Sequence, residues 1–498
     1  MTLRFAVPCA LALCLTVAAA RSDDRSEFVT RSGTSLQLAG KPFRYSGPNI
    51  EWLGLVGYGP HDPLGPRYPT RFEIDDAFDT AKEMGARVVR SQTMGDSVGC
   101  PQCIEPKLGE FNNEAFQFID YAIQAARARG IRLIVTLIGD CAACSNGGIG
   151  QYLEWTHQTD PSAFFSDPTL IAAFEKHVET VLNHRNALTG VAYKDDPTIL
   201  AWENCNMCGL FALFGPAKNI PAYIAWTDTI GAYIKSIDQR HLYLDTTGLF
   251  PFNKAALEVK TPDMITFEYY PHWQVLMPGT QKITPATFSR DAAAVTGHGK
   301  AYIVNEVGWD VTNWPTRDDL QAVLHQFEAD PNISGDDYWA LQAHAPGFGW
   351  QPIPADVHDS AYAHKGESGQ WWALYYGGLG TMVNTAEDMR ARAEQLRTHA
   401  FAMAGTATAP PHIVPAPPAI TSVVFGSLVA WRGSAGAVKY SVQRKTGAAG
   451  EWVTICDRCA TDADVPWPDP KPAMMGAAKY RVIAYNADGV ASTPSEAK

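Results

Sequence analysis

The chain has 498 residues, which is too long for one average domain and long enough for a large domain followed by a small one. Its composition, 46% hydrophobic and 18% charged residues, is typical of a globular protein. The formal charge of −12 argues against a nucleic-acid partner, because phosphate binding needs clustered Lys and Arg side chains.

The first predicted element is an export signal. Arg4 supplies a positive start, residues 5–17 form an apolar core, and the alanines at 18–20 form a cleavage site of small residues. Cys14 could accept a lipid, but the large residue before it disfavours this modification. The signal is too short to span a membrane, and no later segment has the ~20 apolar residues of a span. We therefore expect residues 1–20 to be a cleaved signal peptide, and the protein to be secreted or periplasmic.

Between residues 25 and 404, eight short apolar runs alternate with segments of helical periodicity. Eight strands separated by helices predict an α/β fold, a closed (β/α)8 TIM barrel, with catalytic side chains at the carboxyl ends of the strands. An open doubly wound sheet is the alternative. A Gly-rich phosphate loop after the first strand would favour this alternative, and Ser46-Gly47-Pro48-Asn49 does not resemble one. The predicted strands cover residues 43–49, 87–93, 132–140, 199–206, 241–247, 264–270, 301–307 and 336–342.

Two of the intervening helices have clear signals. Apolar side chains share one face over residues 113–129, Asn112 or Asn113 can cap the start, and Gly130 follows the end. A second helix is predicted over residues 220–238.

A Pro-rich run, GTATAPPHIVPAPPA, begins at Gly405 and carries almost no charge, as a semi-rigid spacer would. It predicts a linker over residues 405–414 that joins domains at 25–404 and 415–498. The second domain has the pattern of a small all-β sandwich. It resembles a fibronectin type III domain, and the residues that carry this resemblance are Trp431, Tyr440, Tyr480 and Tyr485. Its predicted strands cover residues 420–431, 438–444, 452–456 and 479–485.

Eight of the ten cysteines lie outside the export signal, and they form four C-x-x-C pairs. An exported protein meets an oxidising compartment, so disulfides are the first interpretation. The same spacing also suits zinc ligands or a redox site, and it does not reveal whether each pair closes on itself. We expect disulfides, with no metal and no cofactor. The pairs are Cys100/Cys103, Cys141/Cys144, Cys205/Cys208 and Cys456/Cys459.

A barrel would bring the ends of its strands together at one mouth. Carboxylates, one Arg, amides and aromatic rings there describe a site for a neutral polyhydroxylated ligand, such as a polysaccharide or oligosaccharide. No G-x-S-x-G or H-E-x-x-H motif supports a serine hydrolase or a zinc protease. The mouth residues are Asn49, Trp52, Arg90, Asp140, Glu203, Asn206, Asp245, Glu268, Tyr270, Glu306, Trp339 and Gln342.

Four motifs make a family resemblance specific. They are KDDPTILAWE ending at Glu203, GKPF followed by GPNIEWL in the first strand, GARVVR in the second strand, and GIRLI in the third. Over most of residues 30–400 the chain resembles the endo-β-1,4-mannanases of glycoside hydrolase family 5. The resemblance implies a retaining hydrolase of a β-linked, mannan-like glycan, and we expect a monomer.

The resemblance also implies roles for single residues. Glu306 would be the nucleophile, and Tyr270 would donate a hydrogen bond to it. Arg90 would support the nucleophile electrostatically, Asn206 would bind the sugar 2-hydroxyl, and Trp339 would lie under the sugar at the cleavage point. Retention of configuration needs a second carboxyl group about 5–5.5 Å from the nucleophile.

The chain departs from the family where that second carboxyl group should be. Met207 occupies the position of the family's acid/base Glu, and Glu268 occupies the position of a His. Either Glu268 or Asp140 has taken over the acid role, or the protein is a non-catalytic glycan binder, or its chemistry differs. Of the two carboxyl groups, Glu268 is the better candidate, and Glu203 is expected to be structural.

Overall fold

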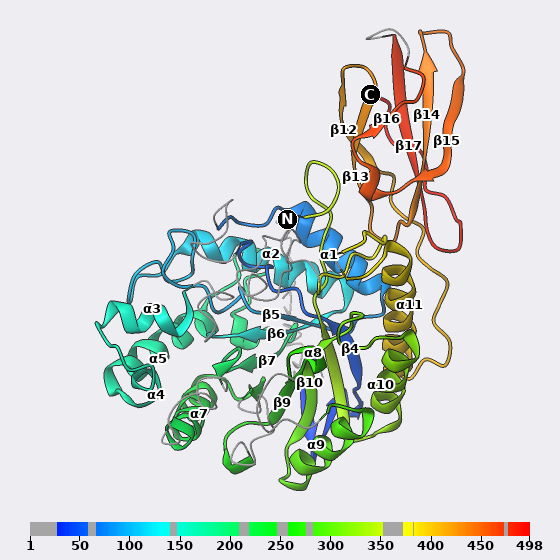
Figure 1. Cartoon of the computed structure of the whole chain (residues 1–498). Helices are drawn as coiled ribbons and strands as arrows, with labels where there is room; N and C mark the ends of the chain where they lie inside the picture. The colour runs from blue at the N-terminus through cyan, green and yellow to red at the C-terminus, as the bar shows by residue number, and fades with distance from the viewer. Residues whose placement is uncertain are drawn as a thin grey trace, which may run out of the picture.

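Figure 1 shows a computed structural model of the chain, in which a large barrel carries a small β-rich module at one side. The structure describes residues 27–57, 66–139, 147–208, 219–246, 257–274, 282–351, 372–381, 383–472 and 477–498.

Eight parallel strands form the barrel and confirm the predicted fold class. Their order is β4-β11-β10-β9-β8-β7-β6-β5, and a bridge between Asn49 and Arg90 joins the carboxyl ends of the first and last of them. The strands are β4 (Tyr45–Pro48), β5 (Val88–Ser91), β6 (Arg132–Thr136), β7 (Ile199–Glu203), β8 (Leu242–Asp245), β9 (Met264–Tyr269), β10 (Ala301–Gly308) and β11 (Ile333–Trp339).

The last of these strands begins and ends three residues earlier than predicted. Its first half, ISGDD, has a glycine and two acidic residues, so it does not look like a buried strand. Gly335 is needed because a Cβ atom there would lie 2.2 Å from the Tyr45 ring. The two carboxylates are paired inside the protein: Asp336 with Ser46 and His399, and Asp337 with Tyr45.

The helices surround the barrel. The helix predicted over residues 113–129 is present with these bounds: Asn112 accepts a hydrogen bond from the Glu114 amide, and Gly130 ends it with φ 73°. The other predicted helix lies one residue earlier. The described helices are α1 (Arg71–Glu83), α2 (Asn113–Arg129), α3 (Gly148–Trp155), α4 (Ala163–Ser166), α5 (Pro168–Asn183), α7 (Asn219–Ile237), α8 (Pro271–Gln274), α9 (Pro285–Gly297), α10 (Arg317–Ala329) and α11 (Ala386–Met403), with a 3-10 turn, η3 (Tyr193–Asp195).

A small antiparallel sheet that the sequence pattern did not predict comes before the barrel. It consists of β1 (Val29–Ser32), β2 (Ser35–Leu38) and β3 (Lys41–Pro42). Val29 and Leu36 belong to the same buried apolar cluster as Leu200 and Ile303 of the barrel strands. This sheet therefore covers the amino end of the barrel, and polar side chains gather at the other end.

The C-terminal module has two three-stranded sheets, β12-β13-β16 and β15-β14-β17. Trp431, Tyr440 and Tyr480 lie in its core, and the fibronectin type III resemblance and the domain bounds stay predictions. The run at 420–431 is two strands, because the chain turns at Phe425 and Gly426 with φ of 52° and 69°. The elements are β12 (Ala419–Val424), β13 (Leu428–Arg432), β14 (Lys439–Thr446), β15 (Trp452–Ala460), η6 (Asp462–Asp464), β16 (Trp467–Pro468) and β17 (Ala478–Tyr485).

The part of the chain that the structure describes has no helix with the length and apolar character needed to cross a membrane.

Candidate active site

Four ionisable side chains meet at the carboxyl ends of the barrel strands. Arg90 comes from β5, Glu203 from β7, Glu268 from β9 and Glu306 from β10, and all four are buried. Because parallel strands all end on the same face of a barrel, residues far apart in the sequence converge here.

Arg90 is the centre of this group. Its Nε and one terminal nitrogen donate to the two oxygens of Glu203, both at 2.7 Å. The terminal nitrogens also donate to Asn49 at 2.9 Å, to Glu306 at 2.6 Å and to Asn206 at 2.7 Å. All five N–H groups of the guanidinium are thus used. Burial alone would lower the pKa of Arg90, but the Glu203 and Glu306 carboxylates outweigh burial and raise the pKa well above its usual value.

Glu203 has the environment of a structural carboxylate. Besides the two bonds from Arg90, it accepts hydrogen bonds from Thr136 at 2.6 Å and from Asn305 at 3.1 Å. These four donors fill its two oxygens, so Glu203 is built to hold Arg90.

Glu306 is held by two donors. Arg90 donates to Oε1, and the Tyr270 hydroxyl donates to Oε2, both at 2.6 Å. Burial raises the pKa of Glu306, whereas Arg90 and Tyr270 stabilise its anion and oppose that rise. The carboxylate is therefore fixed in orientation, as a nucleophile must be.

Glu268 lies directly opposite Glu306 in the pairing of β9 with β10. Burial, and then the negative charge of Glu306, raise the pKa of Glu268 well above its usual value. Of the two carboxyl groups, Glu306 has the guanidinium and the phenol that stabilise an anion. The proton of the pair therefore belongs on Glu268. The N–H groups of Arg90 donate to Glu203, Asn49, Glu306 and Asn206, and the positive charge of Arg90 opposes the rise in the pKa of Glu268.

Met207 occupies an unusual place beside these groups. It follows Asn206, whose side chain accepts the bond from Arg90 and whose amide donates to Ile138 at 2.7 Å. Its φ is 61°, a left-handed conformation that is uncommon for a residue with a long side chain. A disulfide between Cys205 and Cys208 encloses Asn206 and Met207.

The aromatic residues predicted at the mouth differ in exposure. Trp339 is half-buried, and its ring lies 5.7 Å from that of Trp372. Trp52 is buried in the hydrophobic core, and Asn49 is buried with its amide bonded to Arg90 and to the Asn305 carbonyl. Binding of substrate by Trp52, Asn49 and Asn206 stays a prediction.

Three of the predicted cysteine pairs close on themselves as disulfides: Cys100–Cys103, Cys205–Cys208 and Cys456–Cys459. Cys141, Cys144 and Asp140 lie outside the described residues. Within the described ranges, no cluster of three or more His, Cys, Asp or Glu residues could hold a metal ion.

Sequence reasoning missed Asp96. It is buried beyond β5, and burial raises its pKa to about 7, although His177 and Arg90 oppose the rise. It also missed Asn305, which links Glu203 to Asn49. The position of Asn305 immediately before Glu306 was the available signal, whereas nothing in the sequence around Asp96 predicts that it is buried.

Comparisons with known proteins relate part of the chain to one protein family and the barrel to solved structures. Residues 26–255, a little under half of the chain, match the family model described as GH family 5 beta-mannosidase-like. A putative mannan endo-1,4-beta-mannosidase 4 of Arabidopsis thaliana is 32% identical over 233 residues, which are 45% of this chain and 52% of that protein. The chain thus spans about half the length of the curated relatives it matches.

Solved structures extend the likeness of fold over the whole barrel. An endo-1,4-beta-mannanase from Rhizomucor miehei, 24% identical, covers 76% of this chain and 100% of its own, with a TM-score of 0.57. A glycoside hydrolase family 5 mannosidase from the same organism, in complex with mannosyl-fructose, is 19% identical, with a TM-score of 0.56 and the same coverage. Glu268, Tyr270, Glu306 and Trp339 lie beyond the residues that the family model matches, so only the fold relates them to these proteins. Over residues 26–255 the chain is similar to the β-mannosidase-like proteins of glycoside hydrolase family 5.

Proposed function

We propose that this chain is a retaining glycoside hydrolase that cleaves a β-linked, mannan-like glycan, with Glu306 as the nucleophile and Glu268 as the acid/base. The observation that carries the proposal is the pair itself: an oriented carboxylate held by Arg90 and Tyr270, beside a second carboxyl group on the next strand. Two buried carboxyl groups with pKa values pushed apart are typical of acid/base assignments in hydrolases.

The proposed reaction has two steps. In the first, Oε of Glu306 forms a bond to the anomeric carbon while the glycosidic bond breaks, and Glu268 gives its proton to the departing oxygen. In the second, the Glu268 carboxylate takes a proton from water, and the water oxygen displaces Glu306 from the sugar. Neighbouring strands are ~4.8 Å apart, which is close to the carboxyl separation of about 5–5.5 Å in retaining enzymes.

The choice of a mannan-like substrate rests on the relatives. The curated relative is named for mannan endo-1,4-beta-mannosidase activity, and a solved structure of the same fold contains mannosyl-fructose. Trp339, half-buried at the mouth, offers an apolar ring face against which a sugar can stack. The disulfides and the predicted signal peptide support a secreted or periplasmic location, and we propose that the protein acts there as a monomer.

Met207 favours a second candidate, a glycan-binding protein without hydrolase activity. A thioether cannot donate a proton, and loss of general-acid help typically costs 10²–10⁴-fold in rate. In this case Glu306 and Arg90 would be remnants of a catalytic site that now only binds sugar.

An activated substrate separates the two candidates. An aryl β-mannoside with a good leaving group needs little acid assistance, so the hydrolase should cleave it at a rate that Glu306→Gln abolishes. A mechanism-based 2-fluoromannoside should attach to Glu306, as peptide mass spectrometry would reveal. Absence of both turnover and labelling in a folded protein, with binding of mannohexaose retained, would establish the binding protein instead.

A further inference from the structure

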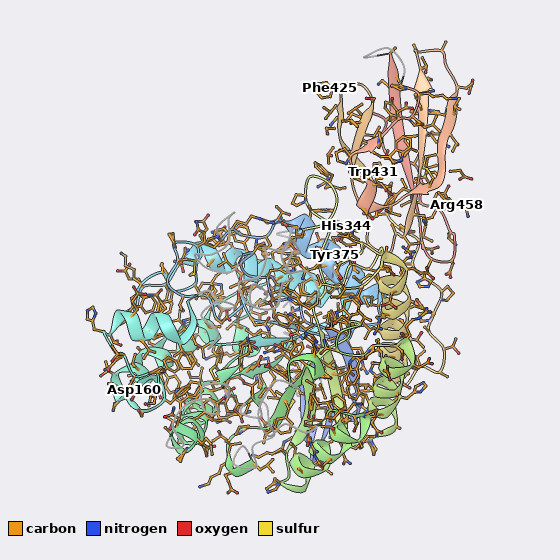
Figure 2. All side chains as sticks on the ribbon, in the orientation of Figure 1. Asp160, His344, Tyr375, Phe425, Trp431 and Arg458 are labelled. Carbon is orange, nitrogen blue, oxygen red and sulfur yellow. A yellow bond between two sulfur atoms is a disulfide. The ribbon has the colours of Figure 1, made fainter. Side chains whose placement is uncertain are left out.

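The C-terminal module is joined to the barrel through a buried histidine. His344 follows β11, and its Nδ1 lies 2.9 Å from Asp76 of α1, while its Nε2 lies 3.2 Å from Asp462 of the module. Asp462 in turn accepts a hydrogen bond from Tyr440 of β14 at 2.8 Å. Figure 2 shows His344 at the junction, between the barrel and the module core around Trp431. One imidazole thus bridges carboxylates of two domains.

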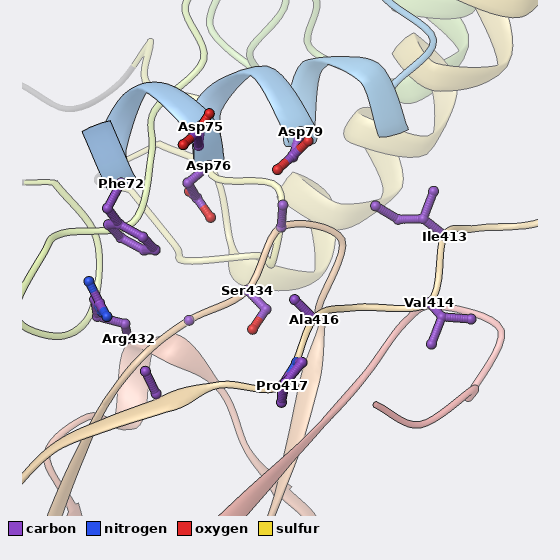
Figure 3. A pocket seen from close by; sticks show the side chains of 13 residues that line it. Phe72, Asp75, Asp76, Asp79, Ile413, Val414, Ala416, Pro417, Arg432 and Ser434 are labelled. Atoms are coloured by element: carbon purple, nitrogen blue, oxygen red, sulfur yellow. The ribbon is translucent and has the colours of Figure 1, made fainter. Parts of the chain in front are cut away.

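The same junction admits no added atom. A Cβ atom on Gly433 of the module would lie 2.3 Å from the His344 ring and 2.6 Å from Asp462. Beside it, the guanidinium of Arg432 lies 4.6 Å from the centre of the Phe72 ring of α1. Figure 3 shows this region, where carboxylates of α1 face the linker across a groove of about 390 Å³.

A second histidine ties the linker to the same helix. His412 Nδ1 lies 2.6 Å from Glu83 of α1, and the Tyr376 hydroxyl donates to Glu83 at 3.0 Å. The module reaches this point too, because Asp488 accepts the His412 amide at 2.9 Å and Asn486 donates to the His412 carbonyl at 3.1 Å.

His344 belongs to one wall of the mouth, and His412 contacts the same wall at Tyr376. We define this wall as residues 339–351 and 372–376 and call it the Trp339 wall. Its two parts are bonded to each other: the Ala340 amide donates to the Trp372 carbonyl at 3.2 Å, and the Leu374 amide donates to Ala340 at 2.8 Å. Trp372 also accepts from the indole of Trp309, three residues after Glu306, at 3.0 Å. The wall therefore connects the candidate nucleophile strand with the domain junction.

Aromatic stacking completes this connection. The His344 ring stacks on Trp350 with 4.0 Å between ring centres, and Trp350 meets Tyr375 edge-on at 5.2 Å. Tyr376, the next residue, is the one that donates to Glu83. At its other end the wall carries Trp339, the ring proposed to lie under the sugar.

We propose that the C-terminal module is a brace that positions the Trp339 wall of the active site, with Asp462 and His344 as its positioning residues. This inference rests on the proposed function, because it assigns Trp339 to the substrate. The brace acts by restricting motion: most of the wall lies outside the barrel strands, and the two histidine junctions fix it to α1. Burial would lower the pKa of His344, but Asp76 and Asp462 raise it to about 10, so the imidazole stays charged and both ion pairs persist at neutral pH.

Two variants and a charge-matched control test the brace in the full chain. Asp462→Asn removes the charge that faces His344, and Tyr440→Phe removes only the hydroxyl that orients Asp462. Asp457→Asn is the control, because Asp457 is exposed in β15 of the same module and accepts a bond from Ser441 of β14. Hydrogen–deuterium exchange would follow the amides of the Trp339 wall, and kcat/KM would be measured on mannan oligosaccharides.

In Asp462→Asn and, more weakly, in Tyr440→Phe, we expect wall amides to exchange at least about tenfold faster and kcat/KM to fall by about 10–100-fold. Asp457→Asn should match the wild type in both measurements. Unchanged wall exchange in a folded Asp462→Asn protein would overturn the brace, and faster exchange with unchanged kcat/KM would overturn its link to the active site. If the wild type cleaves nothing, the proposed function fails, and the exchange comparison still decides whether the brace exists.

Discussion

Glu268 and Glu306 are direct neighbours across two parallel strands, and Glu306 accepts hydrogen bonds from Arg90 and Tyr270 that stabilise its negative charge. Burial and the charge of Glu306 raise the pKa of Glu268 well above its usual value, so the proton belongs on Glu268 and the charge on Glu306. In the proposed mechanism, Glu268 of β9 therefore supplies the proton that Met207 cannot donate.

Glu268→Gln should lower kcat on natural glycans by about 10²–10⁴-fold and have much less effect on an activated aryl glycoside. The raised pKa of Glu268 keeps it protonated, and activity on natural glycans is lost as the pH rises through that pKa. The Glu268→Gln variant has no such group, so the loss of activity at high pH should disappear from its pH profile. Steady-state pH profiles on both substrates check this, with the exposed Glu258→Gln as control. Equal losses on the two substrates would argue against an acid role.

Tyr270→Phe removes a 2.6 Å hydrogen bond to Glu306, a contact with a charged group that is worth about 1.5–3 kcal/mol. Since this bond lowers the pKa of Glu306, its loss should raise that pKa and move the acidic limb of kcat/KM to higher pH. Tyr269→Phe is the matched control, because the hydroxyl of Tyr269 contacts Asp291 and Tyr302 instead. The assignment fails if both variants shift the limb equally.

Much of this site follows from the sequence, because an apolar run that ends in a charged residue identifies both a strand and its mouth end. That pattern located Arg90, Glu203 and Glu306 on β5, β7 and β10. The division of roles among them does not follow from the pattern. The four donors around Glu203 indicate a structural role, and two of them, Thr136 of β6 and Asn305 of β10, are uncharged residues that the pattern does not single out.

The sequence is least informative where buried polar residues pair across long distances. The first half of β11 cannot be recognised as a strand in the sequence, because it contains Asp336 and Asp337, whose partners lie 63 to 292 residues away in the chain. The domain junction cannot be recognised in the sequence for the same reason. Nothing in the sequence distinguishes its residues, His344, Asp76 and Asp462, from ordinary surface residues. A linker rich in proline predicts a spacer, whereas the structure fixes that linker to α1 through His412.

Glu203→Ala should destabilise the fold by about 3–5 kcal/mol, because it leaves the Arg90 guanidinium buried with one carboxylate fewer. Glu110→Ala, which breaks an exposed pair with Lys107, should change stability by at most about 1 kcal/mol. Urea unfolding of the two variants checks the difference. If Glu203→Ala does not fold, Glu203→Gln, which retains part of the hydrogen bonding, should show a smaller loss of the same sign. A wild-type midpoint in either Glu203 variant would contradict the structural role.

The pKa of His344 predicts how stability depends on pH. The folded protein holds this proton up to a pKa of about 10, whereas a free histidine loses it near pH ~6.5. The stabilisation is therefore fully present below ~6.5 and is lost as the pH rises through about 10. The unfolding midpoint of the wild type should decrease as the pH rises from 7 to 10. The His344→Gln variant should be less stable at pH 7, and its midpoint should decrease less over this range. Parallel pH curves for the two proteins would contradict the buried imidazolium.

Gly433→Ala tests the domain junction without changing any charge. The added methyl group would overlap the His344 ring and Asp462, so the module must shift and the ion pair between them must lengthen. Gly347→Ala is the control, because Gly347 lies in the Trp339 wall and a Cβ atom there meets nothing within 4 Å. We expect Gly433→Ala to lose about 1–3 kcal/mol of stability and to exchange wall amides faster, as overpacked sites do. Gly347→Ala should be neutral or slightly stabilised, because alanine restricts the unfolded chain. Calorimetry and hydrogen exchange on this pair of variants test whether the junction is closely packed. If the module were attached only through the linker, neither substitution would change stability or the exchange of the wall amides.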